Sequence, residues 1–356
     1  MDVTKYLKQA VALGASDLFV AAGGPVSVKL GGQLQSLGGD KLRPEDSREL
    51  ISQVYALAGR DMARYEAAGD DDFSFPVSGL ARFRVSAYRQ RASLAAVIRV
   101  VSFSIPDWKS LGIPEEVMGL SRVKSGLILV TGTAGSGKST TQACIIDRIN
   151  HERACHIVTL EDPVEFLHRN DKSMVSQREI AIDTENYLTG LRACLRQAPD
   201  VILLGEMRDD KTIQTAMTAA ETGHTVIATL HTRGAANSID RIIDVFPAQQ
   251  QSQIRIQLAG VLHSVVSQQL LPSADGGRVP AFEILHANSA IRNRIREGKT
   301  HQMGAALASA GEQGMQTMDG AVLQLYRAGK ITLETALAAA DDPERLRRVL
   351  ELGEGK

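Results

Sequence analysis

The sequence has few cysteines and few aromatic residues. Its 356 residues include only Cys144, Cys155 and Cys194, and no two of them form a C-x-x-C pair. This excludes a disulfide framework and a tetracysteine zinc site, and a reducing compartment is the simplest setting. Aromatic residues make up 4% of the chain, with a single tryptophan, which is too few for platforms on which nucleic-acid bases stack.

The sequence also lacks an excess of charge and a long apolar run. Lys and Arg number 40 against 41 Asp and Glu, so the formal net charge is −1. This balance argues against a protein held to nucleic acid or anionic lipid by bulk charge. No run approaches the roughly 18 apolar residues of a membrane span, and the first ten residues lack the apolar core of a signal peptide. We therefore expect a cytoplasmic protein.

The length predicts two domains, at about 150 residues each. The first hundred residues have the pattern of an α+β unit, with helices over 2–13 and from Pro44, and with alternating strands near 81–91 and 93–101. Two prolines and a glycine interrupt the pattern between residues 102 and 114. We place the boundary there, which gives domains at 1–105 and 106–356.

The second domain alternates apolar strands with helical segments. Near-continuous apolar runs occur at 126–131, 156–161, 201–206 and 225–231. Such runs indicate a parallel sheet that is covered on both faces, so the fold class is α/β. From about residue 247 the chain is predicted to be mostly helical, with one long helix over 249–271.

A phosphate-binding loop is the strongest motif. The segment GTAGSGKS matches G-x-x-x-x-G-K-[ST] and lies between a predicted strand and a predicted helix, as this motif requires. Backbone amides and the helix N-terminus would hold the β-phosphate of ATP, and Lys138 would reach the β- and γ-phosphates. The Ser139 hydroxyl would bind Mg²⁺. The predicted nucleotide-binding residues are Gly132, Thr133, Ala134, Gly135, Ser136, Gly137, Lys138, Ser139 and Thr140.

Hydrolysis requires a carboxylate at the end of a neighbouring strand. The predicted strand at 201–206 ends in a carboxylate, and its Gly205 stands where many P-loop enzymes have Asp, so Glu206 is left to hold Mg²⁺ directly or through water. An acidic turn, Glu161-Asp162-Pro163-Val164-Glu165, follows another strand, and its Glu165 could polarise the attacking water. A solvated turn is an equally good interpretation of Glu161 and Asp162, because Asp before Pro commonly starts turns.

Two histidines frame the strand at 225–230. His224 and His231 are seven residues apart, so on a strand their rings point to opposite faces and do not form a metal pair. At the end of the strand, His231 is suited to sense the γ-phosphate. For His224, a structural hydrogen bond is as plausible as a functional role.

Arginines on two strands of the first domain allow two interpretations. Arg82 and Arg84 share one strand face, and Arg99 lies on the next strand. They form either a surface ion-pair patch or a group that reaches nucleotide on the same or a neighbouring subunit. Arg192 and Arg196, four apart before a proline, either do the same or pack locally.

The motifs together resemble a known family. The phosphate loop, LEDPVE, LRQAPDVILLGEMRD, TGHTVIATLHT and IDRIIDVFP occur in the order seen in the retraction ATPases of bacterial type IV pili, within the type II/IV secretion ATPase superfamily. The resemblance covers nearly the whole chain. AIRNRIREGK at 290–299 resembles the C-terminal segment needed for retraction, with Arg294 where Leu is typical. VSQREIAIDTE and ADDPERLRR are closer to the accessory retraction ATPases, which remain an alternative.

The resemblance implies a homohexameric ring whose subunits have a PAS-like N-terminal domain and a RecA-like ATPase domain, with nucleotide between them. It gives catalytic roles to Glu165, Glu206 and His231, and phosphate contacts to Arg84 and Arg99. Its implied partners are an inner-membrane platform protein and a second retraction ATPase, at the inner face of the cytoplasmic membrane.

The absence of a tetracysteine zinc element favours retraction over pilus assembly. The balanced charge and the scarcity of aromatic residues disfavour a RecA-like nucleic-acid translocase. A nucleotide-dependent switch with little turnover is a further alternative. Mg²⁺-dependent hydrolysis by the pure protein would separate it from a motor.

Overall fold

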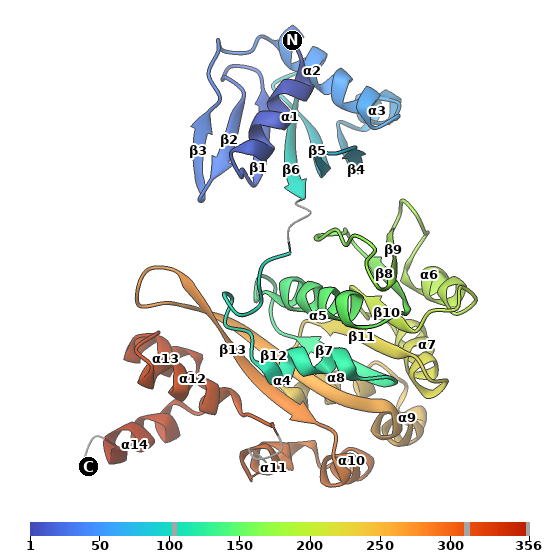
Figure 1. Cartoon of the computed structure of the whole chain (residues 1–356), viewed down its shortest axis with the longest axis vertical. Helices are drawn as coiled ribbons and strands as arrows, with labels where there is room; N and C mark the ends of the chain where they lie inside the picture. The colour runs from blue at the N-terminus through green and yellow to red at the C-terminus, as the bar shows by residue number, and fades with distance from the viewer. Residues whose placement is uncertain (102–104, 310–313, 354–356) are drawn as a thin grey trace. The chain divides into compact units, whose positions relative to one another are not determined.

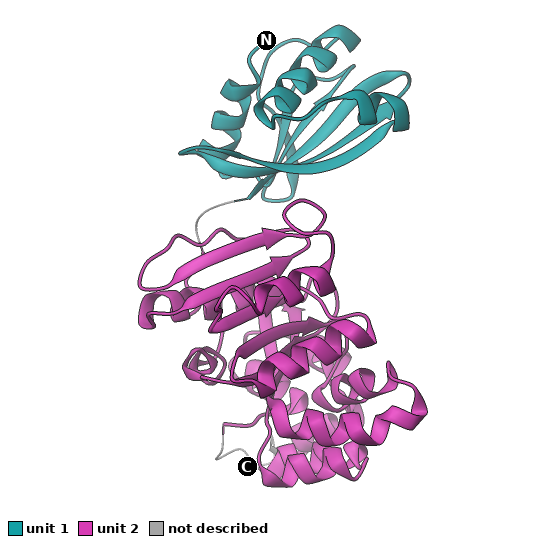
Figure 2. Cartoon of the chain, turned by 90° about the vertical axis from the view of Figure 1, so that its right-hand side faces the viewer, with its two compact units in different colours: residues 1–104 teal, residues 105–356 magenta. Residues whose placement is uncertain are grey.

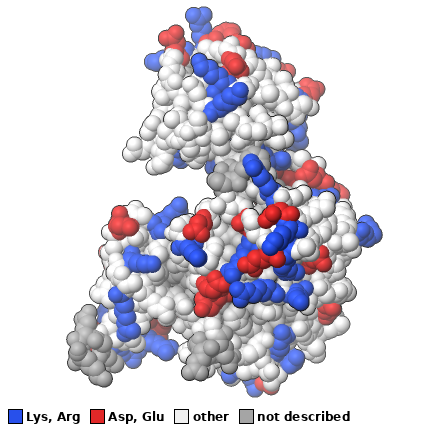
Figure 3. Space-filling view, viewed as in Figure 1, with Lys and Arg blue, Asp and Glu red and all other residues white. Residues whose placement is uncertain are grey.

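The computed structural model describes residues 1–101, 105–309 and 314–353. The chain forms two compact units, residues 1–104 and 105–356 (Figure 2). Residues 102–104, at the start of the predicted boundary segment, lie outside the described residues. Among the described helices, none is both long and apolar enough to cross a membrane. On the face seen in Figure 3, basic and acidic side chains are interspersed and form no stripe of one sign.

Unit 1 contains an antiparallel six-stranded sheet in the order β3-β2-β1-β6-β5-β4, with helices packed on one face (Figure 2). The strands are β1 (Asp17–Ala21), β2 (Ser27–Leu30), β3 (Gln33–Ser36), β4 (Asp70–Val77), β5 (Ala81–Gln90) and β6 (Ser93–Val101). The helices are α1 (Val3–Ala12), α2 (Pro44–Leu57) and α3 (Ala63–Ala68).

The alternation predicted for β5 is confirmed. Phe83, Val85 and Ala87 are buried against the helices, whereas Arg82 and Arg84 point to the other face and stay partly exposed. The sequence analysis did not predict β3 or β4. All four residues of β3 are exposed, and β4 begins with three aspartates, so neither strand carries a clear apolar pattern at its start.

Unit 2 contains a seven-stranded sheet in the order β13-β12-β7-β11-β10-β8-β9 (Figure 1). Its strands are β7 (Gly126–Thr131), β8 (His156–Glu161), β9 (Met174–Glu179), β10 (Val201–Leu204), β11 (Thr225–Leu230), β12 (Leu262–Pro272) and β13 (Arg278–His286). All neighbouring pairs are parallel except β12 and β13. The predicted parallel sheet is therefore confirmed.

Helices cover both faces of this sheet. The helices of unit 2 are α4 (Glu115–Met118), η1 (Gly119–Arg122), α5 (Lys138–Glu152), α6 (Tyr187–Cys194), α7 (Asp210–Glu221), α8 (Ala235–Asp244), α9 (Ala248–Val261), α10 (Ser289–Arg296), η2 (Thr300–Gln302), α11 (Met303–Ser309), α12 (Met318–Arg327), α13 (Leu333–Ala339) and α14 (Pro343–Gly353). Alternate residues of β7 enter two different cores: Leu127 and Leu129 pack with α7 to α9, and Ile128 and Val130 pack with α5.

The prediction of one long helix over 249–271 is wrong. The helix α9 ends at Val261, and the chain continues as β12 between β7 and β13. Val265 and Val266 are both fully buried, each in a different core cluster on opposite faces of the sheet. A strand buried on both faces is apolar on both sides, so periodicity alone does not separate it from a buried helix.

Candidate nucleotide site

The phosphate loop joins the end of β7 to the start of α5. Gly132, Gly135 and Gly137 have φ angles of 143°, 76° and 89°, which residues with a Cβ rarely adopt. Gly137 is the N-cap of α5 and supplies no side-chain hydrogen bond. The first amides of α5 are therefore left without a side-chain cap, as is typical of a helix N-terminus that binds an anion.

Lys138 is folded over this loop. Its Nζ donates hydrogen bonds to the carbonyl oxygens of Gly132, at 2.9 Å, and Thr133, at 2.8 Å. The side chain is buried, and this burial lowers the pKa of Lys138, while the nearby Glu165 and Glu206 act to raise it. A buried ammonium between two carboxylates and the loop is suited to bind a polyanion.

A cavity of about 330 Å³ opens beside the loop at the carboxyl ends of the parallel strands. It brings together seven predicted site residues from four segments: Ala134, Gly135, Lys138, Ser139, Glu165, Glu206 and His231. The other lining residues are Gln142, Ala143, Glu161, Asp162, Pro163, Phe166, His168, Tyr187, Leu203, Gly205, Arg208 and Thr229. The carboxyl ends of parallel strands meet at one edge, so residues far apart in sequence converge here.

Glu206 lies at the centre of a charged cluster. Its Oε1 accepts a hydrogen bond from Arg208 Nε and lies 3.4 Å from His231 Nε2. The Glu206 side chain is 16% exposed, whereas that of Arg208 is 79% exposed. The Ser139 hydroxyl and the Glu206 carboxylate line the same cavity, and such oxygen donors fit Mg²⁺.

The packing around Gly205 explains why no aspartate stands there. A Cβ on Gly205 would lie 2.8 Å from the Tyr187 hydroxyl oxygen and 3.2 Å from the carbonyl oxygen of Leu160. The first contact is closer than real Cβ atoms show, and the second involves backbone that cannot rotate away. Glu206 is therefore the first residue after β10 that can present a carboxylate to the cavity.

The acidic turn after β8 places two carboxylates, those of Glu161 and Glu165, in different environments. Glu161 accepts hydrogen bonds from Thr159 Oγ1 at 2.6 Å, from Gln177 Nε2 at 3.2 Å and from the backbone of Glu165. Burial raises the pKa of Glu161 to about 7. Glu165 is exposed and lines the cavity. Glu161 thus holds the turn, and Glu165 is the carboxylate available to a ligand.

A Glu161→Gln variant is expected to be more stable than the wild type at neutral pH and equal to it in acid. The pKa is raised in the folded state from about 4.5 to about 7, so folding favours the protonated acid. The free energy of unfolding of the wild type therefore falls as the pH rises from about 4.5 to about 7, by about 3 kcal/mol once Glu161 is fully ionised. Differential scanning fluorimetry between pH 5 and 8 measures this. Glu165→Gln is the matched control, and a difference that does not grow with pH would contradict the prediction.

The remaining predicted loop residues lie outside the lining of this cavity. They are Gly132, Thr133, Ser136, Gly137 and Thr140. Thr133 and Ser136 line a second cavity on the far side of the loop, and Gly137 and Thr140 line a third beside α5. The loop therefore borders three hollows.

Arg84 and Arg99 belong to unit 1, whereas the cavity belongs to unit 2. They are direct partners across β5 and β6, so their side chains share one face of the sheet. Arg99 Nε donates to Asp17 Oδ1 at 3.0 Å, and the Arg99 side chain is 63% exposed.

Three other residues for which two interpretations were open, His224, Arg192 and Arg196, take part in local contacts. His224 Nδ1 lies 2.9 Å from the carbonyl oxygen of Ala219 at the end of α7, which is a structural contact. Arg196 lies beyond the end of α6, and its Nη1 donates to the carbonyl oxygen of Arg192 at 3.1 Å. This hydrogen bond is of the local kind that the sequence analysis gave as one of two interpretations.

The cavity residues that were not predicted include Gln142, His168 and Tyr187. Gln142 is buried on α5, and its Oε1 accepts from Thr229 Oγ1 at 3.1 Å, while its Nε2 has no hydrogen-bond partner among the described residues. Burial lowers the pKa of His168 to about 4, so this side chain is neutral at pH 7. Tyr187 lines the cavity beside Gly205. Of these three residues, only Gln142 could have been found from the sequence, because it lies one helical turn after Ser139 and so shares its face of the predicted helix.

Comparison with known proteins extends these observations to the whole chain. A profile of the type II/IV secretion system protein family matches residues 1–325. The type IV pilus retraction ATPase PilT of Pseudomonas aeruginosa is 43% identical over 345 residues, which are 97% of this chain and 99% of that protein. The type IV pilus ATPase PilU of the same organism is 39% identical over 356 residues, 99% and 92% of the two chains.

The fold also matches a solved structure. The crystal structure of the pilus retraction motor PilT with bound ADP has a TM-score of 0.90 and 45% identity, covering 98% of this chain and 99% of that chain. The mixed α/β fold with two sheets is therefore shared along the chain.

Proposed function

Because this chain belongs to the family of type II/IV secretion system proteins, we propose that it is a motor ATPase that powers retraction of type IV pili. The chain is an ATPase of this family, similar to PilT along 97% of its length. The observation that carries the proposal is the cavity in which Lys138, Ser139 and two carboxylates meet beside the phosphate loop.

The chemistry that we propose assigns each residue one task. Loop amides and the N-terminus of α5 hold the β-phosphate of ATP, and Lys138 moves its ammonium from the loop carbonyls to the β- and γ-phosphates. Ser139 and Glu206 hold Mg²⁺, which neutralises phosphate charge when bound. Glu165 orients the attacking water and accepts its proton, and His231 senses the γ-phosphate next to Glu206.

The architecture that we propose follows the same family. Unit 1 is proposed to be PAS-like and unit 2 RecA-like, as in the family; helices on one face of the antiparallel sheet of unit 1, and a phosphate loop after a parallel strand of unit 2, support this. The subunits form a homohexamer in the cytoplasm. The ring acts on an inner-membrane platform protein, so it is peripheral to the membrane and drives pilin disassembly.

An accessory role beside a second retraction ATPase is the other candidate. The observation that favours it is the 39% identity to PilU over 99% of the chain, close to the value for PilT. The two candidates differ in whether this chain alone supports retraction. To separate the two candidates, this chain is expressed in a strain that has no other retraction ATPase. Twitching in that strain would support the motor, and its absence would support the accessory role.

Deletion of the gene tests the proposed function directly. We expect cells that keep surface pili and no longer twitch, because assembly continues while retraction stops. Complementation with the wild-type chain should restore twitching, and complementation with Lys138→Ala should not. Loss of surface pili in the deletion strain would contradict retraction and indicate assembly.

We expect Arg84→Ala and Arg99→Ala each to lower ATP turnover at least about tenfold, because an arginine that reaches phosphate stabilises transition-state charge. Melting temperatures should change little, since both side chains lie on a partly exposed sheet face. Arg89→Ala is the matched control, an exposed arginine on the same strand. Full turnover in both variants would assign these residues to a surface patch.

A further inference from the structure

The strand β12 runs beside the phosphate loop. It pairs in parallel with β7, and Ser267 stands opposite Thr131, the last residue of β7. Where β7 ends and the loop begins, β12 continues for five more residues to Pro272. Gln268, the next residue after Ser267, is therefore placed against the first glycine of the loop, and it is buried.

Gln268 contacts the loop at both of its terminal glycines. A Cβ on Gly132 would lie 2.3 Å from the carbonyl oxygen of Gln268, and a Cβ on Gly137 would lie 2.8 Å from Gln268 Nε2. The backbone of Gln268 thus contacts the first residue of the six-residue loop, Gly132, and its side chain contacts the last, Gly137. Neither glycine can carry a side chain, for this reason as well as for its positive φ.

The first turn of α5 fixes the Gln268 carboxamide. Thr141 Oγ1 donates to Gln268 Oε1 at 2.8 Å, and both residues are buried. This hydrogen bond determines which way the amide points, so its Nε2 faces Gly137 and not the core. Gln268 and Thr141 also line the cavity beside Gly137 and Thr140.

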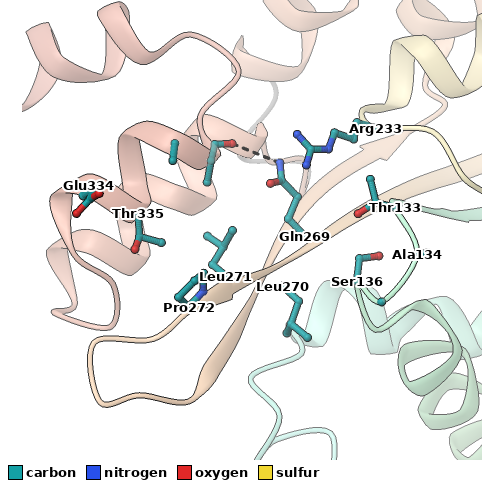
Figure 4. A pocket seen from close by; sticks show the side chains of 13 residues that line it. Thr133, Ala134, Ser136, Arg233, Gln269, Leu270, Leu271, Pro272, Glu334 and Thr335 are labelled. Carbon is teal, nitrogen blue, oxygen red and sulfur yellow. Dashed lines mark hydrogen bonds between the residues drawn. The ribbon is translucent and has the colours of Figure 1, made fainter.

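The neighbouring glutamine has the same chemistry on the opposite face of the strand. Gln269 points into the cavity of about 410 Å³ on the far side of the loop, where its Nε2 donates to the carbonyl oxygen of Ala339 at 3.4 Å (Figure 4). Arg233, Thr133 and Ser136 border the same hollow (Figure 4). Gln269 has no contact with Gly132 or Gly137 among the close contacts of those glycines.

We propose that Gln268 is a positioning residue that holds the phosphate loop in the shape that binds nucleotide. It fixes the distance between Gly132 and Gly137, and with it the direction of the amides that point at the β-phosphate. A loop held in advance loses less freedom when the ligand binds. The inference rests on the proposed nucleotide site, since it concerns how that site is held and not what it does.

The test compares Gln268→Met with Gln269→Met. Methionine keeps the length and volume of glutamine and removes both polar atoms, so the core stays filled. For Gln268→Met we expect the Kd for a fluorescent ADP analogue and the KM for ATP to rise about tenfold, while kcat changes less than about threefold. The melting temperature without nucleotide should stay close to that of the wild type. Gln269→Met should keep the wild-type Kd.

A second substitution tests the hydrogen bond. Thr141→Val removes the hydroxyl that fixes the carboxamide, so it should weaken ADP binding in the same direction, and the double variant should be no weaker than Gln268→Met alone. Additive effects would overturn the role of this bond. Gln268→Met with wild-type Kd and KM would overturn the inference, as would equal losses in Gln269→Met. Failure of the wild-type chain to bind ADP would instead reject the proposed nucleotide site.

Discussion

A Glu206→Gln variant is expected to bind ATP with nearly wild-type affinity and to hydrolyse it about 10³-fold more slowly. Glu206 is the first residue after β10 that can present a carboxylate to the cavity, because Gly205 has no room for a side chain. The amide keeps the size of the side chain and removes the charge. Removal of one electrostatic contact to a transition state costs about 10²–10³ in rate. Because the variant also loses the proposed contact to Mg²⁺, we expect the upper end of this range, a rate about 10³-fold lower.

The measurements are steady-state phosphate release and equilibrium binding of a fluorescent ATP analogue, each with Mg²⁺. Glu185→Gln, which changes an exposed carboxylate that does not line the cavity, is the control and should behave like the wild type. Full turnover by Glu206→Gln would show that its assigned role is wrong. Glu165→Gln would then be the variant to examine, since Glu165 is the other carboxylate that an ATP phosphate could meet.

A Lys138→Ala variant is expected to lose both tight nucleotide binding and hydrolysis, with turnover falling to background, roughly 10³-fold or more below the wild type. Two effects combine. The variant removes the only cationic side chain that the loop itself carries, and it removes the two hydrogen bonds that Lys138 Nζ donates to the carbonyl oxygens of Gly132 and Thr133, although the Thr133 oxygen still accepts from the backbone N–H of Ser136. The loop then has no ammonium to attract phosphate and less to keep it closed.

Lys172→Ala, at an exposed position after the acidic turn, is the matched control for the loss of a lysine charge. Circular dichroism and the melting temperature establish that the variant is folded, because a buried lysine replaced by alanine leaves a small void. Wild-type turnover by a folded Lys138→Ala protein would reject the nucleotide site itself.

Much of the candidate site could be predicted because its parts follow one rule of topology. Each of the segments that contains Lys138, Glu165, Glu206 and His231 comes directly after an apolar strand, and parallel strands bring those ends to one edge. The phosphate loop added a local motif with a fixed conformation. A single sequence is sufficient for such inferences, since they depend on order and on chain direction.

Other parts depend on packing that a pattern does not encode. Gln268 lies 131 positions after Gly137 in the numbering, and it meets the loop only because β12 pairs with β7. The apolar stretch that contains β12 has spacings compatible with a helix, so the strand was missed and this contact with it. The sequence likewise did not show why residue 205 is a glycine, because the Tyr187 hydroxyl that occupies the place of a Cβ at this position comes from α6.

The position of β7 in the middle of its sheet has a mechanical consequence. Its backbone is paired on one side with β11 over six residues and on the other with β12, and every residue of β7 is buried. A strand fixed on both edges opens only when the whole unit unfolds, and its amide hydrogens are among the last to exchange with solvent. The loop therefore starts from an anchor that does not yield. If ATP turnover moves a pilus, the movement must come from segments other than β7, and the sheet stays rigid while they move.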